Sequence, residues 1–121
     1  MFNTPRRTLL TCCFIAGLVA TPAMLAEAQE NNTTNNALVD FAHQSGTMAG
    51  GAQFCMAEED TLEEYIGAVE ARIALLAKDD YEKIFGRLEF KNTFAVSSAT
   101  EPSSGCEQHM RAFSSIIKDI Q

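Results

Sequence analysis

Two cysteines, Cys55 and Cys106, constrain this chain more than any other feature of its sequence. The other two cysteines, Cys12 and Cys13, lie in an N-terminal segment that we expect to be removed. With two thiols left, only one intrachain disulfide can form. Closing a loop of about fifty residues would stabilise so small a fold by about 4 kcal/mol in the chain-entropy model. We therefore predict a Cys55–Cys106 disulfide, in preference to two free thiols or an intermolecular bridge.

Residues 1–28 have the layout of a cleavable export signal. Arg6 and Arg7 supply positive charge ahead of an apolar run at residues 9–20, and Ala28 offers a cleavage site. The apolar run is shorter than the roughly 20 residues of a membrane span, which favours cleavage over an anchor. The arginines leave a twin-arginine route open beside the general secretory one. We expect an exported protein, in the bacterial periplasm or otherwise secreted, where disulfides persist.

Removal of the signal leaves a strongly acidic chain. Arg6, Arg7 and Glu27 leave with it, so seven of nine basic and fifteen of sixteen acidic side chains remain, a formal charge of −8. Such a surface repels nucleic-acid phosphates and anionic bilayers. We therefore expect no nucleic-acid partner, no membrane span after cleavage, and another protein as the partner.

The rest of the chain shows helical periodicity and no alternating stretch typical of a sheet. Residues 29–36 are polar throughout, which predicts a disordered tail. Residues 37–121 are predicted to form an all-α domain, a small bundle of three to four helices stapled by one disulfide. The disulfide would join the end of the first helix to the start of the last.

The first helix is predicted over about residues 37–55, and its glycines admit two interpretations. Ala42, Gly46 and Gly50 lie four residues apart on one stripe, where another helix could approach closely. Each glycine also weakens a helix by up to about 1 kcal/mol relative to alanine. A break near Gly50 and Gly51 is therefore the alternative, and the sequence leaves both open.

The second helix has a capping-box sequence, with Thr61 as the N-cap and Glu64 reaching back to it. Two aspartates, Asp79 and Asp80, then end or kink it, so residues 62–94 are predicted as one helix or two. Apolar residues recur at helical spacing on both sides of the aspartates. They are Leu62, Tyr65, Ile66, Val69, Ile73 and Leu76 before them and Tyr81, Ile84, Phe85 and Leu88 after them, followed less regularly by Phe90 and Phe94.

The last helix follows a polar loop and opens with a second capping box, from Ser104 to Glu107. Alternating steps of four and three residues then predict a bundle-type seam. The seam residues are Cys106, Met110, Phe113, Ile117 and Ile120.

Catalytic and metal chemistry find little support in the sequence. No nucleophile, base and orienting residue are assembled in a recognisable pattern, so we expect no enzyme, no catalytic residue and no cofactor. Soft copper ligands exist, but apolar helix faces account for most of them, and no zinc spacing occurs, so we predict no metal site. These ligands are His43, His109, Met48, Met56 and Met110.

A cluster of five carboxylates is the most unusual surface feature, and it consists of Glu58, Glu59, Asp60, Glu63 and Glu64. A helix N-terminus favours acidic residues and accounts for the last three. Glu58 and Glu59 exceed what capping needs. The cluster is therefore a candidate surface for a basic partner or a weakly held calcium ion.

These observations favour an exported, non-enzymatic protein that binds another protein, as an inhibitor, an immunity-type protein or an accessory subunit. The layout of signal, short helical domain and two cysteines some fifty residues apart also resembles that of HdeA-type acid chaperones. That resemblance implies a periplasmic acid-stress chaperone. Protonation of fifteen carboxylates would leave a cation of about +9, which expands a compact domain by self-repulsion. Weak metal binding is a further alternative.

Overall fold

The structure is a computed structural model that describes residues 23–120, with side chains from Ala37 onward. Four helices make up this part of the chain, and no strand occurs in it. The helices are α1 (Ala23–Phe54), α2 (Glu59–Leu76), α3 (Asp80–Ser97) and α4 (Cys106–Ile120). The predicted all-α bundle with a single disulfide is confirmed.

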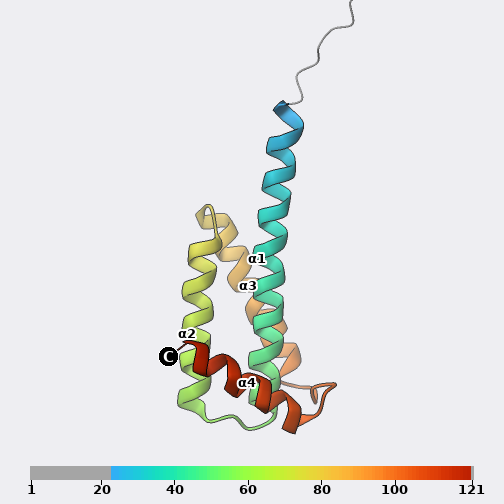
Figure 1. Cartoon of the computed structure of the whole chain (residues 1–121), viewed down its shortest axis with the longest axis vertical. Helices are drawn as coiled ribbons and strands as arrows, with labels where there is room; N and C mark the ends of the chain where they lie inside the picture. Colours follow the sequence, from blue (N-terminus) through green and yellow to red (C-terminus); the bar gives the residue numbers. More distant parts are fainter. Residues whose placement is uncertain (1–22, 121) are drawn as a thin grey trace, which may run out of the picture.

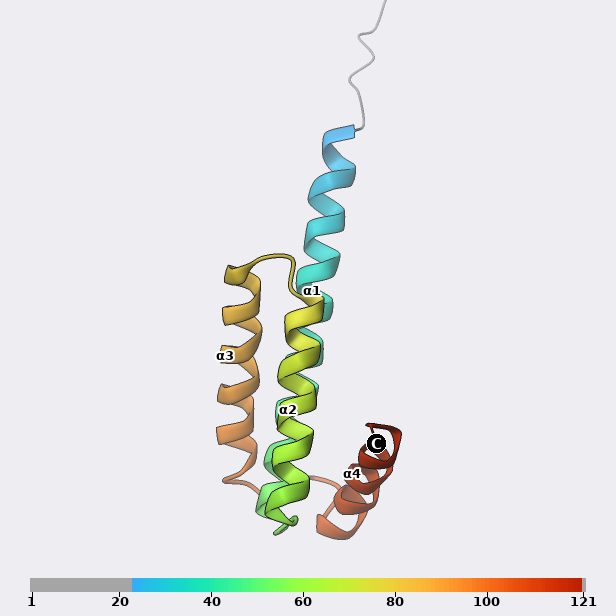
Figure 2. The ribbon, with the colours of Figure 1, turned by 90° about the vertical axis from the view of Figure 1, so that its left-hand side faces the viewer.

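The long helix α1 is the centre of the bundle and contacts each of the other three helices (Figure 1). α2 and α3 run along it, whereas α4 crosses α1 and α2 obliquely at the end of the bundle where α1 finishes. Figure 2 shows α3 on one side of the α1–α2 pair and α4 on the other. α3 and α4 make no contact with each other, so each packs on α1 and α2 alone.

α1 starts at Ala23, well before the predicted residue 37. Its backbone is helical through residues 29–36, in contrast to the disordered tail that the polar composition predicted. A helix that is already nucleated gains one hydrogen bond for each residue added, so a packed segment can extend into a polar one. The apolar run of the predicted export signal lies outside the described residues, and its cleavage stays a prediction.

The stripe of small residues on α1 is where α3 packs, and the helix continues unbroken through its glycines. A Cβ built on Gly46 would lie 2.7 Å from the carbonyl oxygen of Phe90. One built on Gly50 would lie 2.6 Å from the carbonyl oxygen of Phe94. Because backbone from α3 occupies the space of both side chains, only glycine permits this approach. Of the two interpretations of the glycines, close packing is correct.

α1 ends in a Schellman motif, with Met56 at the position that usually holds glycine. The amide of Ala57 donates to the carbonyl of Ala52 (2.9 Å), and the amide of Met56 donates to that of Gln53 (3.0 Å). Met56 has a φ of 63°, the left-handed conformation that this motif requires. The motif reverses the chain and leads directly into α2.

α2 begins at Glu59, so the predicted N-cap at Thr61 is wrong. Thr61 lies inside the first turn, and Glu58 occupies the N-cap position without a side-chain capping bond. The amide of Leu62 donates to the Glu58 carbonyl (3.0 Å), which closes the earlier turn. Acidic residues are favourable in a first turn, and Glu59 and Asp60 supply them two residues before the predicted start.

Residues 62–94 form two helices, which settles the alternative that the sequence left open. The Asp79 carboxylate caps α3 by accepting from the amide of Glu82 (2.8 Å). Glu82 reaches back and accepts from the amide of Lys78 (2.8 Å). This reciprocal pair holds the turn between α2 and α3, so the aspartates end one helix and start the next.

The core is formed by side chains from all four helices. The buried apolar residues are Leu38, Ala42, Ala49, Ala52, Leu62, Tyr65, Val69, Ile73, Phe90, Phe113 and Ile117. The predicted apolar face of α2 is therefore largely buried, and so are Phe113 and Ile117 of the predicted α4 seam. Tyr65 and Phe113 meet edge to face, with ring centroids 5.3 Å apart, and connect α2 to α4.

The apolar residues at the start of α3 do not join this core. Tyr81, Ile84 and Leu88 are 76%, 66% and 52% exposed, and Phe85 is 44% exposed. The buried residues of α3 are Gly86 and Phe90, on the other side of the helix. We call the exposed set, together with Val96, the outer face of α3. The helical spacing of these residues is present, but it places them on the exposed side of α3.

Candidate functional site

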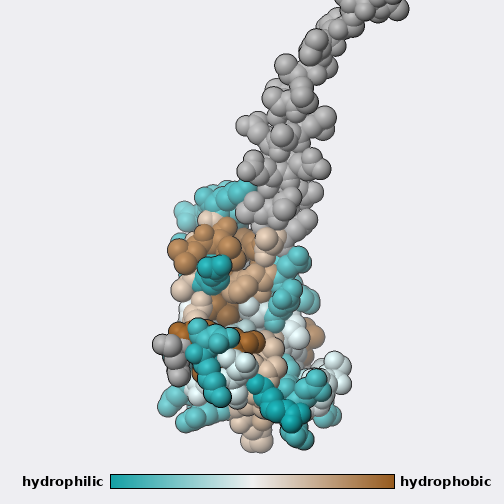
Figure 3. All heavy atoms as spheres, in the orientation of Figure 1, coloured by the Kyte–Doolittle hydropathy of each residue, from teal (hydrophilic) through white to brown (hydrophobic). Residues whose placement is uncertain are grey.

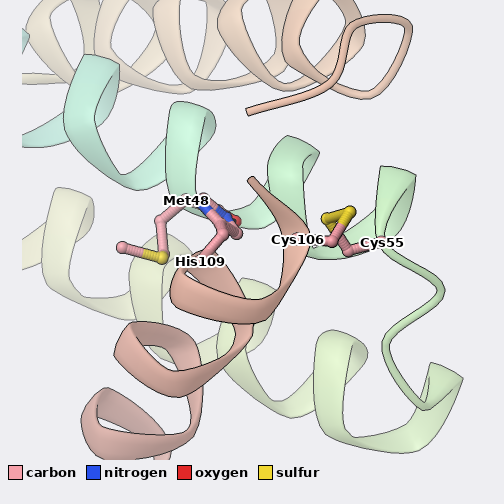
Figure 4. The surroundings of a disulfide bond; sticks show 4 residues. All are labelled: Met48, Cys55, Cys106 and His109. Atoms are coloured by element: carbon pink, nitrogen blue, oxygen red, sulfur yellow. A yellow bond between two sulfur atoms is a disulfide. The ribbon is translucent and has the colours of Figure 1, made fainter. Parts of the chain in front are cut away.

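The disulfide between Cys55 and Cys106 is present, with a Cα–Cα distance of 5.3 Å. It joins the residue after α1 to the first residue of α4 across a separation of 51 residues. α4 is thereby held against the end of α1 (Figure 4). α4 begins at Cys106, so the residue before the helix is Gly105, which has a φ of 79°. The predicted capping box that starts at Ser104 is therefore wrong. Both cysteines are committed to this structural bond.

His109 is part of the packing around the disulfide, one turn into α4 (Figure 4). Its side chain is buried, and its Nε2 lies 2.9 Å from the Met48 carbonyl oxygen of α1. The ring also fills the space of a side chain at Gly51. Imidazole is a metal ligand, but the place of His109 between Cys106 and Phe113 fits the α4 seam. Its observed contacts are structural.

His43 lies on a different side of α1 and faces α3. Its Nδ1 lies 3.0 Å from a carboxylate oxygen of Glu89 and 3.3 Å from the hydroxyl of Thr93. A catalytic triad needs the carboxylate on one ring nitrogen and the nucleophilic hydroxyl on the other. Because both groups approach the same nitrogen, this cluster has the wrong geometry for nucleophilic catalysis. It connects α1 to α3 at the surface.

The residues considered as copper ligands are dispersed. His43 and His109 lie in separate clusters, Met48 is half-buried near His109, and Met56 is 90% exposed. Met110 is half-buried on α4. Within residues 37–120, no three His, Cys, Asp or Glu side chains lie close enough together to hold a metal ion.

The acidic cluster lies at the start of α2. Its members occupy the N-cap and the first two turns, and all five side chains are exposed: Glu58, Glu59, Asp60, Glu63 and Glu64. The earlier start of α2 places Glu58 and Glu59 where the helix dipole favours them. The helix dipole therefore also accounts for Glu58 and Glu59, which the predicted cap at Thr61 left unexplained. A role in partner binding stays a prediction.

An apolar groove lies where α4 crosses α1 and α2, with a volume of about 320 Å³. It is lined by Phe41, Ser45, Tyr65, Ala68, Val69, Arg72, Ile116 and Ile120. Figure 3 shows apolar side chains gathered over this side of the molecule, above α4 and along the upper part of α2. The groove could not be predicted from sequence patterns because its lining residues come from three helices that are distant along the chain.

The polar groups of the groove are few. Tyr65 and Ser45 are hydrogen-bonded to each other by their side chains, and both are buried. Burial raises the pKa of the Tyr65 phenol, and the bond from Ser45 opposes this rise. Arg72 is exposed and is the only basic residue of α2. The groove therefore offers apolar walls and one cationic donor at its edge.

No known protein family matches this chain, and no curated protein or solved structure shows significant similarity to it. Among the helices of residues 23–120, none combines the length and the apolar character needed to span a membrane.

Proposed function

We propose that this chain is an exported, non-enzymatic protein that acts by binding another protein, and that the groove above α4 receives the partner. The single observation that carries the proposal is this groove of about 320 Å³, which the bundle leaves open between Phe41, Val69 and Ile116. Concave apolar sites with a few polar groups are where proteins most often bind other molecules. The volume suits an apolar side chain of a partner, the usual anchor of a protein interface.

Arg72 at the edge of the groove offers the partner a hydrogen-bond donor in addition to the apolar walls. Its guanidinium stands beside apolar walls and can donate to a carboxylate or a main-chain carbonyl next to the inserted side chain. The disulfide and the packed ring of His109 hold α4 in place, so the groove is preformed. A preformed site binds more tightly because less ordering is needed on association.

The test uses two alanines on α2. Ala68 lines the groove and is half-buried, whereas Ala74 is exposed and does not line it. Ala68→Glu should place a charge in the apolar groove, and Ala74→Glu should not. A partner recovered from the native envelope with the wild-type protein should bind Ala74→Glu equally and Ala68→Glu at least about 100-fold more weakly.

Each outcome of this titration is decisive. Equal affinity for both variants refutes the groove as the binding site. The absence of any saturable partner for the wild-type protein refutes the proposed function. Matching helical circular dichroism spectra of the two variants exclude unfolding as the cause of lost binding.

A second candidate, an acid-stress chaperone, is favoured by how α3 is fixed. Its N-cap depends on the carboxylates of Asp79 and Glu82, and its polar link to α1 depends on Glu89. All three contacts need a carboxylate acceptor, so conditions that remove carboxylate charge would weaken them. α3 would then loosen and expose Phe90 in addition to its outer face. Failure to suppress a client's aggregation at about pH 2–3 would exclude this function.

A further inference from the structure

The outer face of α3 is an exposed and mainly apolar surface. Tyr81, Ile84, Phe85 and Leu88 occupy two successive turns, and Val96 continues the face two turns later. The rings of Tyr81 and Phe85 lie nearly parallel, with centroids 6.5 Å apart. Exposed apolar surfaces of this extent usually mark an interaction site.

No helix of residues 23–120 covers this face. With about 100° between successive residues of a helix, Leu88 and Phe90 point in roughly opposite directions. Phe90 points into the core and is 2% exposed. α4 does not contact α3, and α3 forms an outer edge of the bundle in Figure 2. Nothing within residues 23–120 therefore occupies this face, and once the predicted export signal is removed its occupant must come from another molecule.

Charge distinguishes α3 from α2, the other helix that runs along α1. α2 carries five acidic residues and one basic residue, whereas α3 carries three of each sign. A second copy of an acidic chain is repelled at α2 but meets no net charge at α3. The three bases of α3 are Lys83, Arg87 and Lys91. The neutral helix with the apolar face is thus where two copies can meet.

We propose that two copies of this protein form a symmetric dimer in which the outer faces of α3 pack antiparallel. A two-fold axis near Gly86 brings Ile84 of each copy opposite Leu88 of the other. The same symmetry places Lys91 at one margin of the face near Asp80 of the second copy, because both residues lie on the same margin of α3. Opposite charges therefore meet twice, once on each side of the axis.

The available area is sufficient for such a dimer. With large apolar side chains carrying about 150–250 Å² each, the exposed parts of Tyr81, Ile84, Phe85 and Leu88, which face α3 of the second copy, amount to roughly 500 Å² per copy. A standard interface removes about 800 Å² from each partner, and polar residues at its rim contribute part of it. The apolar residues alone thus supply more than half of the area needed. This dimer leaves the groove above α4 open, so the inference goes beyond the proposed function.

The test is the oligomeric state of the protein purified from the cell envelope, measured by analytical ultracentrifugation over a range of concentrations. The wild-type protein should sediment as a dimer at micromolar concentrations. Leu88→Glu places like charges together at the centre of the interface and should raise the dissociation constant at least about 100-fold. Met56→Glu introduces the same charge at an exposed apolar residue far along the chain from α3 and should stay dimeric.

Charge reversal tests the antiparallel arrangement. Lys91→Glu alone and Asp80→Lys alone should each weaken the dimer, and the double variant should recover affinity. A wild-type monomer at about 100 µM would overturn the proposal, because a stable interface of standard size saturates well below that concentration. A dimer that tolerates Leu88→Glu as well as it tolerates Met56→Glu would equally overturn it. Absence of recovery in the double variant would refute the antiparallel pairing.

Discussion

Replacing two helical glycines with alanine should change the stability of this protein in opposite directions. Gly67 is exposed in α2, and a Cβ there would meet no neighbouring atom within 4 Å. Gly46 in α1 faces α3, where a Cβ would lie 2.7 Å from the Phe90 carbonyl oxygen and 2.8 Å from the Thr93 Cβ. The same substitution therefore tests helix propensity at one site and interhelical packing at the other.

The magnitudes follow from these surroundings. Alanine is more favourable than glycine inside a helix by about 1 kcal/mol, so Gly67→Ala should raise the free energy of unfolding by that amount. Gly46→Ala makes the same gain, but an ordinary Cβ contact begins at 3.4 Å, so α3 must shift by roughly 0.7 Å. Overpacking costs about 1–3 kcal/mol, and more when the obstacle is backbone. The net loss for Gly46→Ala should be about 2 kcal/mol.

Urea titration of the oxidised protein, followed by far-UV circular dichroism at one fixed protein concentration, measures both values. In thermal melts, each 1 kcal/mol should move Tm by about 4–8 °C for a domain of this size. Gly50→Ala provides a second packing variant, since its Cβ would lie 2.6 Å from the Phe94 carbonyl oxygen. The reasoning is refuted if Gly46→Ala is as stable as Gly67→Ala, because α1 and α3 would then not be in close contact.

Three further changes are expected to alter stability. Met56 has the left-handed conformation that favours glycine, so Met56→Gly should raise the free energy of unfolding by about 1 kcal/mol in the same urea titration. Replacing Cys55 and Cys106 with serine should lower it by about 2–5 kcal/mol, and an unchanged urea midpoint would contradict a stapling role. Burial raises the pKa of Tyr65 above 10.0, so the folded state keeps a proton that the unfolded state loses. Stability should therefore fall as the pH rises above 10.0, and Tyr65→Phe should flatten that decline in urea titrations at about pH 8–11.

The helices and the disulfide were predictable because they depend on local patterns and on cysteine number. The small-residue stripe of α1 also indicated a close helix contact, although the sequence did not identify α3 as the partner. The start of α2 was placed too late because a capping-box sequence competed with a run of acids, and the acids extended the helix. Terminal turns differ in free energy by only about 1 kcal/mol, so such a competition is hard to resolve from sequence.

The groove and the role of His109 depend on tertiary packing. His109 contacts the carbonyl of Met48, 61 residues earlier in the chain, and no pattern along one helix reports such a contact. Its position on the α4 seam was available as a signal, since it lies one turn from Cys106 and four residues before Phe113. A histidine on such a seam is more simply explained by burial with a hydrogen-bond partner than by metal binding.

The close contact between α1 and α3 also explains why the larger apolar residues of α3 point outward. Where backbones approach this closely, the facing side of α3 has room for small residues, as at Gly86 and Ser97, and Phe90 is its only fully buried large side chain. The larger apolar residues are excluded from that contact and lie on the opposite side. A helix that is apolar on two sides is normally buried on two sides, and α1 and α2 cover only one side of α3. Helical periodicity identified Tyr81, Ile84, Phe85 and Leu88 correctly as one side of a helix, whereas the inclusion of Val96 and the exposure of this side required the structure.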